Sequence, residues 1–243
     1  MDTEPQSVND ESKTEIANVI TQLAEAITDR WPQKLPSGEI AYIFGGSMGV
    51  NLIALSTTCV DESGASFPAS GKSKLQEYIR PVNDIDIAPF SPLESPNILM
   101  IPSSEADRIG ALTKFGELKI DNIYPKRNPP HVRVILNSRE YYTFTFDIIA
   151  ASKLLSCLTK FREKPQKLNW ETPRQIKLAE QIYGEDRVWQ LVHQSYQDEL
   201  DLGITAPLWH TVDYQVKKLL ESEDISAELK NLVRRAANSV GLE

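Results

Sequence analysis

The stretch NDIDIA, residues 83–88, alternates acidic and apolar side chains, and it constrains the fold more than any other feature of the chain. Residues two apart on a β-strand point to the same face. As a strand, this stretch places Asp84 and Asp86 side by side, with the isoleucines facing the opposite layer. Two neighbouring carboxylates repel each other, and a divalent cation between them keeps both ionised. The stretch therefore predicts a strand that carries a cation site.

A second stretch places a glycine pair between an expected strand and an expected helix. Residues 39–44 have the pattern of a buried strand, residues 48–55 form an apolar helix, and Gly45, Gly46 and Ser47 lie between them. Glycines let the backbone approach a ligand closely, and the free N–H groups of a first helical turn attract an anion. Ser47 suits either a helix cap or a phosphate contact. Taken alone, this stretch fits a plain structural turn equally well.

A third acidic residue, Asp147, lies in an apolar and aromatic run. The pattern around it predicts a hairpin of two strands, 131–136 and 141–148, with its turn at residues 137–138. A buried carboxylate needs a partner charge or a metal ion. The alternative is that Asp147 caps a helix that begins near residue 150.

Hydrophobic periodicity separates a mixed front of the chain from a helical back. A helical pattern covers residues 11–30, and residues 57–74, rich in Ser, Gly, Thr and Lys, predict a surface loop. From residue 150 helical patterns continue to the end. We therefore expect an α+β protein with an α/β front, made of a disordered tail (1–10), a core (11–150) and an all-helical C-terminal domain (151–243).

Composition narrows the environment in which the protein works. No apolar run approaches the ~20 residues that span a bilayer, so we expect no membrane association. Cys59 and Cys157 stand beside apolar residues, which favours buried free thiols over a disulfide or a zinc site and indicates a reducing cytoplasm. With a net charge of -8, the chain needs a local basic face for any contact with nucleic acid.

The glycine turn, the acidic strand and the later aspartate, in this order, resemble the nucleotidyltransferase superfamily, which has the fold of DNA polymerase β. The matching stretches are FGGSMGVNL, NDIDIAPF and FTFDIIAASKLL, within residues 40–160. The pattern is most similar to compact bacterial members that include the toxins of toxin–antitoxin pairs. The resemblance implies a mixed, mainly antiparallel sheet. It departs in spacing, because more than thirty residues separate Ser47 from Asp84, which the predicted loop at 57–74 would explain.

The resemblance also implies a role for each motif. Asp84, Asp86 and Asp147 would be the catalytic residues and would bind Mg²⁺, with Mn²⁺ as the alternative ion, and Asp147 would also help to deprotonate the attacking hydroxyl. The set expected to hold the triphosphate is Gly45, Gly46, Ser47, Lys153 and, from its place before the acidic strand, Arg80. The alternatives are a solvated helix lysine for Lys153 and a solvated loop charge for Arg80.

These roles define an enzyme that moves a nucleoside monophosphate from a nucleoside triphosphate to a hydroxyl acceptor. RNA such as tRNA, a protein and a small molecule are the candidate acceptors, and an antitoxin protein is a candidate partner. Two rival interpretations stay open: a metal-dependent glycosyltransferase that uses Asp-x-Asp, and an inactive nucleotide- or partner-binding module. RNA would meet a basic face assembled from Lys126, Arg127, Arg133, Lys160, Arg162, Lys164, Lys167, Arg174 and Lys177, interleaved with Phe161 and Trp170.

Overall fold

The computed structural model describes residues 10–80, 82, 85–89, 98–100, 117–122, 130–159, 166–201 and 216–241. The chain divides into two compact units, one within Ser7–Thr145 and the other beginning at Phe146. The first contains a sheet with helices and the second is helical, so the predicted α+β class is confirmed. The tail expected at residues 1–10 lies outside the described residues, except for Asp10, where the first helix begins.

The described strands of the first unit form one mixed sheet in the order β2-β6-β7-β1-β3-β5-β4. Four of the six pairings are antiparallel, and β1–β7 and β3–β5 are parallel. The glycine turn and the acidic strand thus belong to neighbouring central strands, β1 and β3. The strands are β1 (Tyr42–Phe44), β2 (Thr58–Asp61), β3 (Ile85–Pro89), β4 (Ile98–Met100), β5 (Glu117–Asn122), β6 (His131–Leu136) and β7 (Arg139–Phe144).

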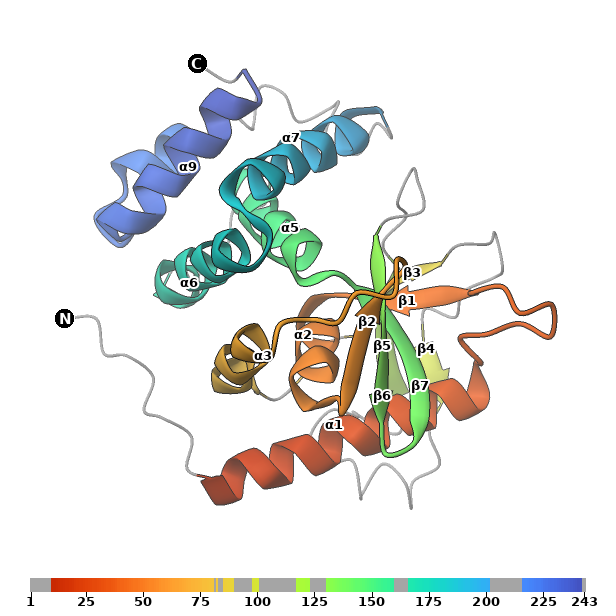
Figure 1. Cartoon of the computed structure of the whole chain (residues 1–243). Helices are drawn as coiled ribbons and strands as arrows, with labels where there is room; N and C mark the ends of the chain where they lie inside the picture. Colours follow the sequence, from red (N-terminus) through yellow and green to blue (C-terminus); the bar gives the residue numbers. More distant parts are fainter. Residues whose placement is uncertain are drawn as a thin grey trace. The chain divides into compact units, whose positions relative to one another are not determined.

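Among the described residues of the first unit, the helices are α1 (Asp10–Arg30), α2 (Gly46–Leu55) and α3 (Ala69–Leu75), with a short 3-10 helix at Gln76–Tyr78 (Figure 1). The predicted helix at 11–30 is confirmed as α1. Helix α2 packs against β3, β6 and β7, and almost all of its residues are buried. An apolar helix therefore starts at the glycine turn and fills the core beside the sheet.

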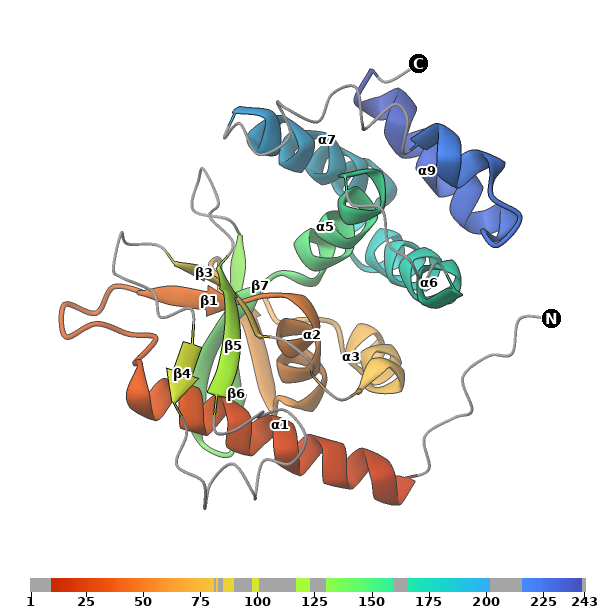
Figure 2. The same cartoon turned by 180° about the vertical axis from the view of Figure 1, so that it is seen from behind.

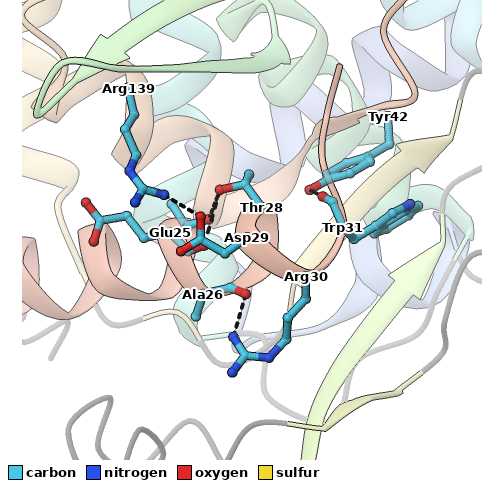
Figure 3. Close-up of polar contacts among 9 residues, drawn as sticks. Glu25, Ala26, Thr28, Asp29, Arg30, Trp31, Tyr42 and Arg139 are labelled. Atoms are coloured by element: carbon cyan, nitrogen blue, oxygen red, sulfur yellow. Dashed lines mark hydrogen bonds and ion pairs between the residues drawn. The ribbon is translucent and has the colours of Figure 1, made fainter. Parts of the chain in front are cut away.

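Polar contacts fix the end of α1 to the sheet (Figure 3). The Arg139 guanidinium on β7 donates to the Asp29 carboxylate on α1 over 2.6 Å. The Tyr42 hydroxyl on β1 donates to the Trp31 carbonyl over 2.7 Å, and the two rings stack with centroids 3.9 Å apart. The Tyr42 contacts hold β1, the strand that leads into the glycine turn, beside the end of α1.

The predicted hairpin is confirmed as β6 and β7. Its turn residues, Asn137 and Ser138, both have positive φ angles of 49° and 63°, as a two-residue hairpin turn with the right twist requires. The second strand ends at Phe144 rather than at residue 148. Helix α5 (Phe146–Thr159) begins two residues later, so the prediction that Asp147 lies on a strand is wrong. The aromatic alternation of β7 continues through Phe146 in the sequence, which is why the pattern predicts a strand longer than the one that ends at Phe144.

The prediction of a surface loop at residues 57–74 is also wrong. This segment contains the edge strand β2 and most of helix α3. β2 pairs with β6 from Thr58↔Ile135 to Asp61↔Val132, and Cys59 is buried. Pairing with a tertiary neighbour overrides the polar, loop-like composition of the segment. The segment at residues 57–74 does not separate the two strands that flank it, since Phe44 on β1 pairs with Ile87 on β3.

The second unit is built from α5, α6 (Gln166–Tyr183), α7 (Glu185–Asp201) and α9 (Ala227–Ser239), together with a helical segment at 216–221 (Figure 2). Helix α5 packs against α6, α7 and α9. Leu154, Val188 and Val233 are among the fully buried residues of this helical core. Gly184, with a φ of 89°, makes the turn between α6 and α7.

Two sequence-based expectations about the environment can be compared with the structure. Cys59 and Cys157 are buried free thiols, as predicted. Burial raises the pKa of Cys59 to about 12, so this thiol stays protonated at neutral pH. Within the described part of the chain, no helix is long and apolar enough to cross a membrane.

Candidate functional site

The glycine turn is bonded directly to the acidic strand. The Gly45 N–H donates to the Asp86 carbonyl over 2.8 Å, and Gly49 N–H donates back to the Gly45 carbonyl, also over 2.8 Å. Helix α2 begins at Gly46 without a side-chain cap or an acidic residue in its first turn. Ser47 therefore lies inside the first turn, and its alternative role as the helix cap is excluded. Through the Gly45 N–H, the glycine turn is thus bonded to the strand that carries Asp86.

Glycine at position 46 is required by both conformation and space. Gly46 has a φ of 48°, in the left-handed region where side chains are strained. A Cβ atom at this position would lie 1.8 Å from Asp86 Oδ2 and 2.8 Å from its Cγ. A Cβ at Gly45 would lie 3.1 Å from the Phe144 ring. The half-buried carboxylate of Asp86 thus lies against the backbone at the start of α2, and a side chain at position 46 would displace it.

Asp121 is a further acidic residue that the sequence analysis missed. β5 runs parallel to β3, and Asp121 is the register partner of Asp86. Neighbouring strands lie ~4.8 Å apart, so the two aspartate positions are adjacent in the sheet. The alternation of Leu118 and Ile120 with charged residues was the available signal, but residue spacing cannot reveal which strands become neighbours. Asp121 thereby becomes a candidate for the third carboxylate of the site.

Asp84 and Arg80 are the two other predicted site residues of the first unit. Asp84, the first residue of the predicted pair, lies outside the described residues. Arg80 is half-buried, and its backbone makes contact with α2 through Asn51. Of the predicted set, the structure therefore brings together Gly45, Gly46 and Asp86.

Asp147 belongs to the second unit, in the first turn of α5, and is fully buried. Its Oδ2 accepts a hydrogen bond from Arg187 Nε over 2.7 Å, and its Oδ1 accepts one from the Ile148 N–H over 3.0 Å. The Arg187 guanidinium lies 5.2 Å from the centre of the Tyr183 ring. The partner charge that a buried carboxylate requires is supplied here by an arginine. The predicted role of Asp147 as a metal ligand stays a prediction.

Lys153, one and a half turns further along α5, is not a solvated helix lysine. Its ammonium forms an ion pair with the buried Glu171 on α6. Gln175 Nε2 donates to the same Glu171 carboxylate over 3.2 Å. Glu171 and Arg187 could not be predicted from the sequence, because each pairs with a residue on another helix.

The predicted basic face is only partly described. Lys126, Arg127 and the residues from Lys160 to Lys164 lie outside the described residues, and Lys167 and Trp170 are placed only as members of α6. Arg133 on β6 pairs with Glu140 on β7 over 3.2 Å. Arg174 and Lys177 are exposed on α6. RNA as a partner stays a prediction.

Together, these observations define an α+β protein whose mixed sheet joins a glycine turn at a helix start to an acidic central strand. No group of three or more metal-ligating side chains is found in the described ranges, which exclude Asp84 and the side chain of Asp121. Comparison of the chain with protein-family models, curated proteins and solved structures finds no match.

A prediction about stability follows from the buried ion pair of the second unit. Arg187→Met leaves the Asp147 carboxylate buried without its partner charge, and we expect a loss of about 2 kcal/mol in the free energy of unfolding, moderated because Arg187 is half exposed. Urea unfolding of the full chain measures it. The double variant Asp147→Asn/Arg187→Met should lose less than the two single variants combined. Wild-type stability of Arg187→Met would show that the pair contributes nothing.

Proposed function

We propose that this chain is a metal-dependent nucleotidyltransferase, which moves a nucleoside monophosphate from a nucleoside triphosphate to a hydroxyl acceptor. The observation that supports it most is the contact between Gly46, at the start of α2, and the Asp86 carboxylate. This contact places a carboxylate, which can bind a cation, beside the backbone N–H groups at a helix start, which can bind phosphate. A magnesium–triphosphate complex presents both complementary charges.

The electrostatics of this contact favour a bound cation. The start of α2 carries the partial positive charge of a helix N-terminus and attracts phosphate. The Asp86 carboxylate beside it repels phosphate, unless a cation lies between them. An alternative is that Asp86 only neutralises the partial charge at the start of α2, and the Mg²⁺ dependence of nucleotide binding separates the two roles.

The chemistry of the donor set suits a divalent ion, because the half-buried Asp86 carboxylate offers oxygen ligands beside the start of α2, which attracts phosphate. Asp86 and Asp84 would hold Mg²⁺, or Mn²⁺ in its place, with Asp121 as the candidate third carboxylate. The ion would supply charge stabilisation for the attacking and leaving oxygens of the transferred phosphate. The chain itself would orient the triphosphate through the N–H groups at the start of α2, from Gly46 onward, and through the Ser47 side chain.

Label transfer tests this proposal. The full chain is incubated with each α-labelled nucleoside triphosphate, Mg²⁺ and total cell RNA, and label is read on RNA and on the protein in the same gel. We expect label on one acceptor and release of pyrophosphate, with neither for Asp86→Asn. Release of a nucleoside diphosphate from a nucleotide sugar instead would support the rival glycosyltransferase. Absence of pyrophosphate release with every acceptor would contradict the proposal.

The toxin role is a separate proposal that rests on the resemblance to toxin–antitoxin members. It predicts that expression of the intact chain arrests bacterial growth, because uncontrolled nucleotidyl transfer would modify an essential acceptor. Colony counts after induction measure this effect. Asp86→Ala should restore growth, and co-expression of a cognate antitoxin protein should do the same. Normal growth with the intact chain expressed at full level would contradict the toxin role.

A further inference from the structure

Asn51 is a polar residue in the most apolar helix of the first unit. It is fully buried, and its neighbours in α2, Val50 and Leu52, are buried as well. Asparagine is unfavourable inside a helix, because its amide competes for backbone hydrogen bonds. A buried amide also costs free energy unless both its N–H and C=O groups are bonded. Asn51 therefore needs a structural reason for its position.

The Asn51 side chain bonds to one residue of another segment through both of its polar atoms. Its Nδ2 donates to the Arg80 carbonyl over 3.0 Å. Its Oδ1 accepts a hydrogen bond from the Arg80 N–H at 3.4 Å. The amide thus replaces a backbone partner for Arg80, as a neighbouring strand would. Arg80 is the residue from which the chain continues into the acidic strand.

This contact ties α2 to the acidic segment at one end. At the other end, the Gly45 N–H donates a hydrogen bond to the Asp86 carbonyl. Gly45 and Asn51 are six residues apart, and so are Arg80 and Asp86. The segment from Arg80 to Asp86, which contains Asp84 in its sequence, is consequently held at both ends by the helix that begins at the glycine turn.

We propose that Asn51 is a positioning residue, which holds the acidic segment against the glycine turn and so sets where the Asp86 carboxylate lies relative to the start of α2. This inference rests on the proposed function for its consequence in metal and nucleotide binding. Its structural part, the tie itself, is independent of that function. Asn51 acts through the Arg80 backbone and touches neither substrate nor metal.

Two substitutions at position 51 separate the tie from the volume of the side chain. Asn51→Leu keeps a side chain of similar size but leaves the Arg80 N–H and C=O without their partner. Asn51→Asp keeps the shape and the acceptor, but it replaces the donor with an oxygen that faces the Arg80 carbonyl. If Asn51→Leu fails to fold, Asn51→Asp provides the test.

Gln33 offers a matched control in the same unit. It is also a buried amide, and its Nε2 donates to the carbonyls of Tyr42 and Tyr142 over 3.1 and 2.9 Å. Its Oε1 accepts from the Tyr142 N–H over 3.0 Å. Gln33→Leu thus removes a comparable buried amide bridge, whose partners lie on β1 and β7 rather than in the segment from Arg80 to Asp86.

The first measurement is hydrogen exchange of the metal-free full chain. We expect the amides of Arg80, of residues 82–86 and of Gly45 to exchange about tenfold faster in Asn51→Leu or Asn51→Asp than in Gln33→Leu. Equal exchange in these segments would overturn the inference. This result is decisive whether or not the protein transfers nucleotides.

The second measurement is the Mg²⁺ dependence of nucleotide binding. It is measured by calorimetry with a non-hydrolysable nucleoside triphosphate. The position-51 variants should need about 10- to 100-fold more Mg²⁺ for half-maximal binding, as expected when a residue behind a metal ligand is lost, and excess Mg²⁺ should restore binding. Gln33→Leu should keep the wild-type requirement. Unchanged Mg²⁺ dependence at position 51 would overturn the positioning role. Failure of the wild-type chain to bind would instead contradict the proposed function, and exchange would still decide the tie.

Discussion

Asp86→Asn is expected to lower the rate of nucleotidyl transfer by about a hundred- to a thousandfold, the loss typical of removing one electrostatic contact to a transition state. The substitution keeps the size of the side chain beside Gly46 but removes the negative charge that would hold the cation. The rate is measured as pyrophosphate release at saturating triphosphate and Mg²⁺. The fold should be retained, because the asparagine fits the same space and the Asp86 carbonyl still bonds to Gly45.

Asp29→Asn is the matched control for this prediction. Asp29 belongs to the same unit, and its carboxylate pairs with Arg139 on an exposed surface. The same loss of one charge there should change the rate by less than about twofold, since exposed substitutions have small effects. If Asp86→Asn were destabilised but still transferred nucleotides at the wild-type rate, Asp86 would serve only the start of helix α2.

Gly46→Ala should combine a loss of stability with a loss of activity. The new Cβ would lie 1.8 Å from Asp86 Oδ2, so the turn or the carboxylate must move. A positive φ and a steric overlap together are expected to cost about 2–5 kcal/mol in the free energy of unfolding. Among molecules that remain folded, transfer should fall about a hundredfold, because displacement of a reacting group by ~1 Å has this effect. Chemical unfolding and pyrophosphate release measure the two effects.

Gly64→Ala separates backbone strain from the overlap with Asp86. Gly64 has a φ of 83°, and a Cβ there would meet nothing within 4 Å. This variant should lose about 1–2 kcal/mol from strain alone and keep its transfer rate. Equal behaviour of Gly46→Ala and Gly64→Ala in both measurements would show that the contact between Gly46 and Asp86 has no functional importance.

Local patterns predicted the parts of the site that depend on neighbours in sequence. The periodicity of residues 11–30 predicted α1, and the turn at residues 137–138 predicted the β6–β7 hairpin. The glycine pair after an apolar strand predicted the start of α2. In each case a helical or alternating period, or a backbone conformation with positive φ, is recorded directly in the residue types.

Features that depend on tertiary neighbours could not be predicted from the sequence. The pairing of β2 with β6 converts a polar segment into an edge strand, and the parallel register of β3 and β5 brings Asp121 beside Asp86. Asp147 looked like a strand residue because Phe146 continues the aromatic alternation, whereas the chain turns into α5. Asn51 gave no signal, since its partner is the backbone of Arg80 rather than a side chain.

The proposal that a metal-bound triphosphate lies at the glycine turn can be tested without knowing the acceptor. The full chain is titrated calorimetrically with a non-hydrolysable nucleoside triphosphate, with and without Mg²⁺. We expect binding that depends on Mg²⁺ in the wild-type chain and is lost in both Asp86→Asn and Gly46→Ala. Binding of equal strength without Mg²⁺, or to Asp86→Asn, would contradict a metal-bound triphosphate at the glycine turn.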